Sequence, residues 1–120
     1  MGEVAASAAI FDEHGRILLV LERDAWSYPG GRVESGETPG QAVVREAREE
    51  AGIEIELGRL VCVREWPDGF VLHVFAVTIA SGEPHAPHGV REVGWFDPTE
   101  LPSPCSRALQ TLPEVLAATT

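Results

Sequence analysis

Three glutamates in one short segment are the residues whose type and spacing best suit chemistry. On an α-helix over residues 39–51, at about 100° per residue, Glu46, Glu49 and Glu50 share an arc of roughly 100°. Like charges at such spacings destabilise a helix, whereas Mg²⁺ is bound by carboxylate oxygens together with water and phosphate oxygens. The cluster therefore predicts a divalent-cation site. A solvated acidic face is the alternative interpretation.

The helix that would carry these glutamates has clear start and stop signals. Thr38 suits the N-cap and Pro39 the first helical position. Gln41 is placed to close a capping box, and Gly52 supplies the stop. The arc beside the glutamates must face the core, because its residues are apolar: Val43, Val44, Ala47 and Ala51. The carboxylates should therefore lie at the border of the core.

A loop with two adjacent glycines precedes this helix. Residues 26–31 read WSYPGG, in which Pro29 lacks a backbone donor and the glycines permit angles that other residues avoid. A backbone without side chains can approach a ligand closely. We therefore expect Gly30 and Gly31 to border the site.

The segment 31–53, GRVESGETPGQAVVREAREEAGI, resembles the Nudix box, G-x5-E-x7-R-E-U-x-E-E-x-G-U, where U is a bulky apolar residue. The positions that match are Gly31, Glu37, Arg45, Glu46, Glu49, Glu50, Gly52 and Ile53. Ala47 is smaller than the residue usual at its position, which predicts close packing of the helix against a sheet. The resemblance extends to the strand before the box and to Glu-Val-Gly-Trp-Phe at 92–96.

The resemblance implies a role for each box residue. Glu49 and Glu50 become the principal ligands of Mg²⁺, which Mn²⁺ can replace, and the Gly30 carbonyl becomes a further ligand. Glu46 becomes either a ligand or the base that activates water. Glu37 and Arg45 are expected to orient the site by pairing with each other or with neighbouring carboxylates.

Residues outside the box complete the expected site. The family often uses one more acid, for which Glu92 is our choice; a surface charge at the end of a strand is the alternative. Arg23 is a candidate for binding a substrate phosphate, with pairing to a neighbouring acid as the alternative. Tyr28 and Phe70 are candidates for contact with the substrate, although isolated aromatic residues often only pack in the core.

The remaining chain supplies strands and a second helix. Residues 4–11 and 17–22 are predicted to form a hairpin around a turn at 12–15, and 53–65, 70–80 and 92–96 should be strands. A C-terminal helix follows 104 and is kinked or restarted at Pro113. The resemblance implies one Nudix domain over 1–120, an α/β/α sandwich with a mixed sheet between the box helix and the C-terminal helix.

Composition excludes several classes of function. A net charge of −10 disfavours stable nucleic-acid binding, and no apolar stretch approaches the roughly 18 residues of a membrane span. We expect a soluble, cytoplasmic protein, because the first residues lack the pattern of a leader. We also expect a monomer or simple homodimer. Cys62 and Cys105 lack metal-ligand spacing and are expected to be buried, reduced thiols.

The resemblance implies Mg²⁺-dependent hydrolysis of the pyrophosphate bond in a nucleoside diphosphate linked to another moiety. A nucleoside triphosphate is the favoured substrate, as in MutT-like pyrophosphohydrolases, although the chain has no Asn for recognition of oxidised guanine. ADP-ribose or another nucleotide sugar is an alternative suggested by Pro67, and dinucleoside polyphosphates are another. A non-catalytic nucleotide-sensing Nudix module and an acidic interaction domain without metal are the alternatives from other classes.

Overall fold

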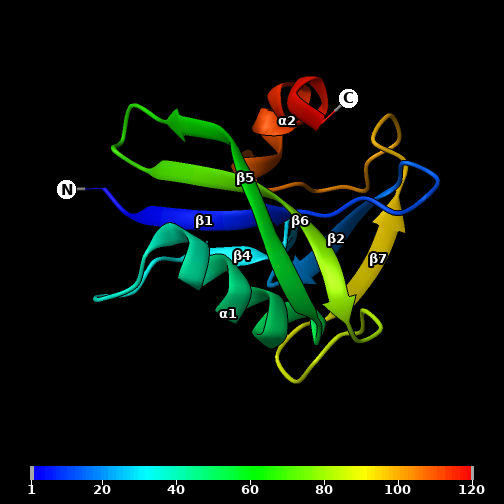
Figure 1. The fold of residues 1–120 in the computed structure, drawn as a ribbon. Coiled ribbons are helices and arrows are strands. Elements are labelled where there is room, and N and C mark those ends of the chain that lie inside the picture. The colour runs from blue at the N-terminus through cyan, green and yellow to red at the C-terminus, as the bar shows by residue number, and fades with distance from the viewer. Residues whose placement is uncertain (1, 120) are drawn as a thin grey trace.

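The computed structural model describes residues 2–119 of the chain (Figure 1). The strands are β1 (Val4–Ala9), β2 (Ile17–Glu22), β3 (Ala25–Ser27), β4 (Gly30–Arg32), β5 (Glu54–Glu65), β6 (Val71–Ser81) and β7 (Glu92–Phe96). The helices are α1 (Pro39–Ala51), the 3-10 helix η1 (Arg107–Thr111) and α2 (Leu112–Thr119).

The strands form two sheets, not one. The larger has the order β4-β1-β6-β5 and is mixed, because β1 is parallel to β6 and antiparallel to β4; the smaller has the order β3-β2-β7. Helix α1 packs beside β1, β4 and β5, and α2 lies across β5 on the other side (Figure 1). Each side has its own buried apolar cluster. The α/β/α arrangement is therefore confirmed, with the strands divided between two sheets.

The predicted hairpin of 4–11 with 17–22 is wrong beyond its turn. The turn itself forms, since the Asp12 N–H donates to the Arg16 carbonyl at 2.9 Å and Phe11 bridges to Ile17. Beyond it, β1 and β2 enter different sheets. The reason is that β4 and β6 occupy both edges of β1, which leaves no edge for β2 to pair with.

Helix α1 has the boundaries that its capping residues predict. The Thr38 hydroxyl accepts from the Gln41 N–H at 3.1 Å, and the Gln41 side chain accepts from the Thr38 N–H at 3.0 Å. Gly52 ends the helix with a φ of 68°, which favours glycine. The small Ala47 is fully buried, whereas Val44 is only half-buried. The caps set the bounds of the helix, and its buried side chains define the face that turns toward the sheets.

The C-terminal segment contains both a confirmed prediction and a wrong one. Pro113 lies in the first turn of α2, directly after η1, so it restarts the helix. Cys105 is exposed rather than buried, because it precedes η1 in a surface segment, and its thiol donates to the Pro102 carbonyl at 3.0 Å. Cys62 is half-buried, and both cysteines are free thiols. Within 2–119, no helix is long and apolar enough to cross a membrane.

Candidate active site

The Glu50 side chain is buried at the junction of α1 and β4. It is only 7% exposed, and its Oε1 accepts a hydrogen bond of 2.8 Å from the backbone N–H of Gly30. Burial, together with the adjacent carboxyl of Glu22, raises the pKa of Glu50 far above its usual range. The ionised form of Glu50 is therefore disfavoured at this position unless a positive charge is supplied nearby.

Glu46 and Glu49 converge on a single cationic nitrogen. Nη1 of Arg45 donates to Oε1 of Glu46 and to Oε1 of Glu49, both at 2.8 Å. Burial raises the pKa of Glu46 even though Arg45 opposes that shift. Glu49 is more exposed and lies at the solvent side of the cluster. One side of α1 thus presents all three box carboxylates.

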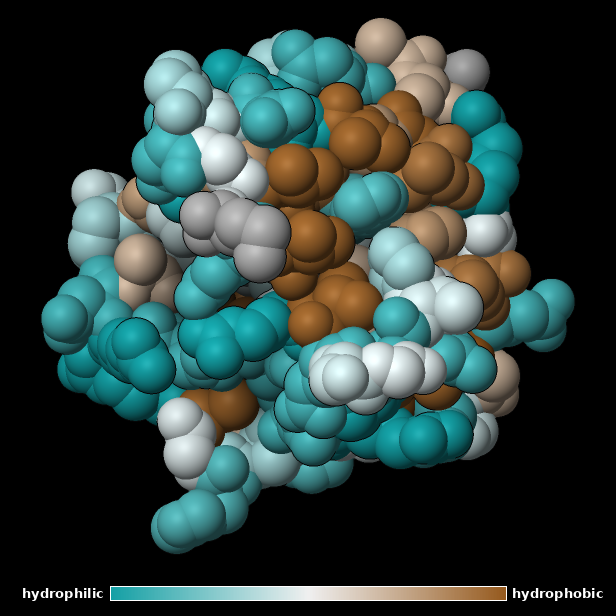
Figure 2. Space-filling view, turned by 90° about the vertical axis from the view of Figure 1, so that its left-hand side faces the viewer, coloured by the Kyte–Doolittle hydropathy of each residue, from teal (hydrophilic) through white to brown (hydrophobic). Residues whose placement is uncertain are grey.

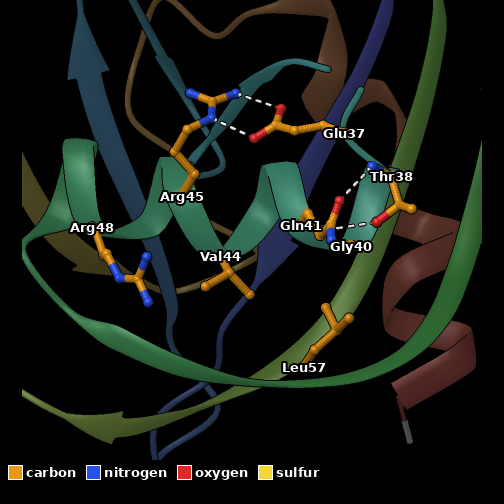
Figure 3. A pocket seen from close by; sticks show the side chains of 8 residues that line it. All are labelled: Glu37, Thr38, Gly40, Gln41, Val44, Arg45, Arg48 and Leu57. Carbon is orange, nitrogen blue, oxygen red and sulfur yellow. Dashed lines mark hydrogen bonds and ion pairs between the residues drawn. The ribbon is translucent and has the colours of Figure 1, made fainter. Parts of the chain in front are cut away.

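The expected pairing of Glu37 with Arg45 is present. Nε and Nη2 of Arg45 donate to the two carboxylate oxygens of Glu37 at 2.7 and 3.0 Å (Figure 3). Nη2 also donates to the Arg32 carbonyl at 3.0 Å. This contact lowers the pKa of Glu37. Arg45 is therefore fixed from both sides, so it can hold Glu46 and Glu49 in place.

Gly30 and Gly31 bring backbone close to the acids because neither has a side chain. A Cβ at Gly31 would lie 2.7 Å from Oε1 of Glu46, and one at Gly30 would lie 2.4 Å from the Ser7 hydroxyl. No larger residue fits at either position without displacing these neighbours. Gly31 thus permits the close approach of β4 to α1, and Gly30 permits the close approach of β4 to β1.

Glu22, which the motif did not indicate, lies at the cluster, whereas Glu92 faces away from it. Glu92 pairs directly with Leu21, whose side chain packs in the cluster on the α2 side. Side chains alternate along a strand, so Glu22 points to the opposite side, toward Glu50. The only signal in the sequence that Glu22 faces α1 was its position two residues after the apolar Val20, which places both side chains on the same side of β2.

A cavity of about 510 Å³ opens beside the glycines. Its lining includes Arg23, Gly30, Gly31 and Phe70, together with Arg107, which was not predicted. The Arg107 guanidinium lies 4.3 Å from the centre of the Phe70 ring and is held by Asp68 at 2.9 Å. Two of the three predicted substrate-binding residues therefore share one cavity with the Gly30 backbone.

Tyr28 lies outside that cavity. It is 1% exposed, and its hydroxyl is 2.9 Å from the Thr111 hydroxyl in the cluster on the α2 side. The structure therefore gives Tyr28 a role in the core rather than a contact with substrate. The sequence did not indicate a buried partner for the Tyr28 hydroxyl, because Thr111 lies far along the chain.

The donor chemistry of the cluster fits a hard divalent cation. Carboxylate oxygens of Glu46, Glu49 and Glu50 are of the type that Mg²⁺ binds. Among residues 2–119, however, no three acidic, histidine or cysteine side chains are already arranged as a ligand set. Glu46, Glu49 and Glu50 lie on the same side of α1, so a cation there would have to draw their oxygens together while Arg45 still contacts Glu46 and Glu49.

The family model of the NUDIX domain matches residues 1–118, so this chain belongs to the Nudix family. It is 35% identical over 103 residues to an ADP-ribose pyrophosphatase of Methanocaldococcus jannaschii, covering 78% of this chain and 61% of that one. It is 38% identical over 83 residues to the CTP pyrophosphohydrolase of Escherichia coli, covering 63% and 62%.

Solved structures show the same relationship. A MutT Nudix hydrolase from Burkholderia pseudomallei superposes with a TM-score of 0.85 at 34% identity, over 100% of this chain and 99% of that one. The chain spans no more than about two thirds of the length of the curated relatives it matches. Family and fold are therefore established by these comparisons.

Proposed function

We propose that this chain hydrolyses the pyrophosphate bond of a nucleoside diphosphate linked to another moiety, using Mg²⁺ held by α1. The observation that carries the proposal is the crowding of the exposed Glu22 and the half-buried Glu46 against the buried carboxyl of Glu50. Such carboxyls repel one another unless a cation lies between them. A nucleoside triphosphate is the substrate that we favour.

Residues of the chain have distinct parts in the proposed reaction. Glu46, Glu49, Glu50 and the Gly30 carbonyl would hold the metal, which would neutralise phosphate charge and lower the pKa of bound water. An activated water attacks one phosphorus, the bond from that phosphorus to the bridging oxygen breaks, and the bridging oxygen leaves with the other phosphate. Glu46 or Glu22 accepts the proton of the water, and Glu37 with Arg45 positions the carboxylates.

The cavity beside Gly30 and Gly31 supports a nucleotide as substrate. Arg23 and Arg107 supply positive charge there, in a chain whose net charge is −10. The aromatic ring of Phe70 offers a surface on which a base can pack. We therefore place phosphate at the glycines and the nucleoside toward Phe70.

ADP-ribose is the second candidate, because a relative of similar identity is named an ADP-ribose pyrophosphatase. A screen of nucleoside triphosphates, ADP-ribose, nucleotide sugars and dinucleoside polyphosphates with Mg²⁺ and with Mn²⁺ separates the candidates. Identification of both products also shows which phosphorus is attacked. Metal binding without any hydrolysis across the panel would instead favour a nucleotide-sensing module.

Glu50→Gln provides the matched test of mechanism. Turnover should fall by at least about a hundredfold while the thermal unfolding temperature is retained, because the amide removes a metal ligand but keeps the shape. Glu13→Gln is the control, since Glu13 is exposed in the turn before β2. Turnover of Glu50→Gln equal to that of the control would refute the proposed site.

We also propose a cytoplasmic location, which the two free thiols support.

A further inference from the structure

Large apolar side chains are exposed along β5. Within the described residues, the exposed large hydrophobic residues are Val4, Leu57, Leu60 and Val63, of which the last three are 41%, 45% and 53% exposed. These three belong to the same strand. Figure 2 shows hydrophobic residues gathered on the side of the molecule where the turn between β5 and β6 lies. Contiguous exposed apolar surface commonly marks a contact with another protein.

Strand β5 is also an edge of the larger sheet. It pairs only with β6, and across 2–119 no backbone–backbone hydrogen bond joins it to any other element. An edge strand with apolar side chains offers both main-chain groups and buried area to a second strand. The order of residues on β5 itself indicates which strand would pair with this edge.

Leu57, Leu60 and Val63 share one side of the sheet. They pair with Val77, Phe75 and His73 of β6, respectively, which alternate along that strand and therefore point the same way. Val77 and Phe75 pack in the cluster beneath α1. The three exposed side chains thus form a row on the α1 side, at the outer margin of the sheet.

Glu56 and Arg64 lie on the opposite side of β5. They pair with Thr78 and Leu72, and Leu72 packs in the cluster on the α2 side. The Arg64 guanidinium is held on that side by the Trp66 ring, 4.9 Å from its centre. The strand therefore carries an apolar row on one side and opposite charges near its two ends on the other.

These residues are arranged symmetrically about Leu60. Leu57 and Val63 lie three residues to either side of it, and Glu56 and Arg64 lie four residues to either side. Of the three register shifts between β5 and β6, two fall on either side of Leu60, between Leu57 and Leu60 and between Leu60 and Cys62, and the third lies at the start of β5, between Glu54 and Ile55. A strand with this arrangement is complementary to an antiparallel copy of itself.

We propose that two copies of this chain associate through antiparallel β5 strands, with the twofold axis at Leu60. Leu60 then meets its own copy, each Leu57 meets Val63, and each Glu56 lies opposite Arg64, so both charge pairs are formed by symmetry. The contact also covers the end of the groove of about 560 Å³ between α1 and β5, where Leu57 lies opposite Val44 and Gly40 (Figure 3).

Charge reversal provides a sharp test by sedimentation equilibrium over a series from micromolar to millimolar protein. Glu56→Arg alone places like charges opposite each other twice per dimer, as does Arg64→Glu alone. Each should raise the dissociation constant by at least about tenfold. The double variant Glu56→Arg with Arg64→Glu should restore association, because the pairs are re-formed with exchanged signs. Glu13→Arg is the control for the change in net charge.

The outcomes separate the proposal from other modes of association. A wild-type dimer that both single reversals weaken and the double variant recovers, with circular dichroism unchanged throughout, would support it. Leu60→Asp should give a monomer with the same fold. A wild-type chain that stays monomeric up to millimolar concentration overturns the proposal. A dimer that the reversals and Leu60→Asp leave unchanged overturns it equally, since another surface then makes the contact.

Discussion

The backbone N–H of Gly30 donates a 2.8 Å hydrogen bond to Oε1 of Glu50, twenty residues further along the chain. This bond joins β4 to the buried side of α1, so the glycine strand and the acidic helix form one unit. Because Glu50 is nearly inaccessible, its position is set by the fold rather than by solvent. The remaining carboxylates are arranged around this fixed point.

Arg45→Lys should lower turnover by about 10- to 100-fold. Lysine keeps the charge, but it cannot donate to both oxygens of Glu37 while contacting Glu46 and Glu49 as the guanidinium does. The concentration of Mg²⁺ that gives half-maximal rate should rise together with the loss of turnover. Arg48→Lys is the matched control, since Arg48 pairs with the exposed Glu54. Equal effects of the two replacements would contradict a positioning role for Arg45.

Glu22→Gln should reduce turnover by about tenfold or more, whereas Glu92→Gln should leave it nearly unchanged. The reason is that Glu22 lies against Glu50, while Glu92 faces the other side of β2 and β7. Steady-state kinetics of the two variants under identical Mg²⁺ concentrations make the comparison. A larger loss in Glu92→Gln would show that Glu92 is the additional acid after all.

Arg23→Ala should raise KM for the nucleotide by about tenfold with little change in kcat. Arg23 lines the cavity beside Gly30 and Gly31, so removal of its guanidinium weakens the binding of substrate phosphate in the ground state and the transition state alike. Arg16→Ala is the control, because Arg16 pairs with Asp12 in the turn before β2. An unchanged KM would remove Arg23 from the site.

Tyr28→Phe should leave turnover unchanged and lower the free energy of unfolding by about 1 kcal/mol, through loss of the bond to Thr111. Turnover that falls with stability intact would return Tyr28 to the substrate site.

The alkaline titration of Tyr28 gives an independent measurement. Burial raises the pKa of Tyr28 from 10.0 to about 12. The folded state thus favours the protonated phenol. The contribution of this preference to the free energy of unfolding is fully present below pH 10 and is lost as pH rises toward 12. The wild-type free energy of unfolding should fall over that range by about 2 to 3 kcal/mol more than that of Tyr28→Phe. Tyrosinate absorbance reports Tyr28 alone, since it is the only tyrosine; titration near pH 10 would contradict its burial.

Local signals in the sequence were sufficient for α1 and for the box residues. The capping box of Thr38 with Gln41 and the stop at Gly52 act between residues close in the chain, so the helix and its acidic side could be predicted. Pairing of Glu37 with Arg45 followed from the motif. In such cases the interaction that determines the structure is contained in the segment itself.

Features that depend on distant residues could not be predicted from the segment alone. The turn at 12–15 indicated a hairpin, but β4 and β6 compete for both edges of β1. Tyr28 is buried because Thr111 meets its hydroxyl, and Glu22 reaches the cluster because β2 ends beside Glu50. Arg107 lines the cavity because η1 brings it to Phe70. Each outcome is decided by tertiary packing.

The most direct test of the proposed metal site is anomalous diffraction from a crystal soaked in Mn²⁺ with a bound nucleotide that is not hydrolysed. The account predicts an anomalous peak ligated by carboxylate oxygens of Glu46, Glu49 and Glu50, with a phosphate oxygen on its open side. The three carboxylates turned apart, with no peak near any of them while nucleotide occupies the cavity, would contradict it.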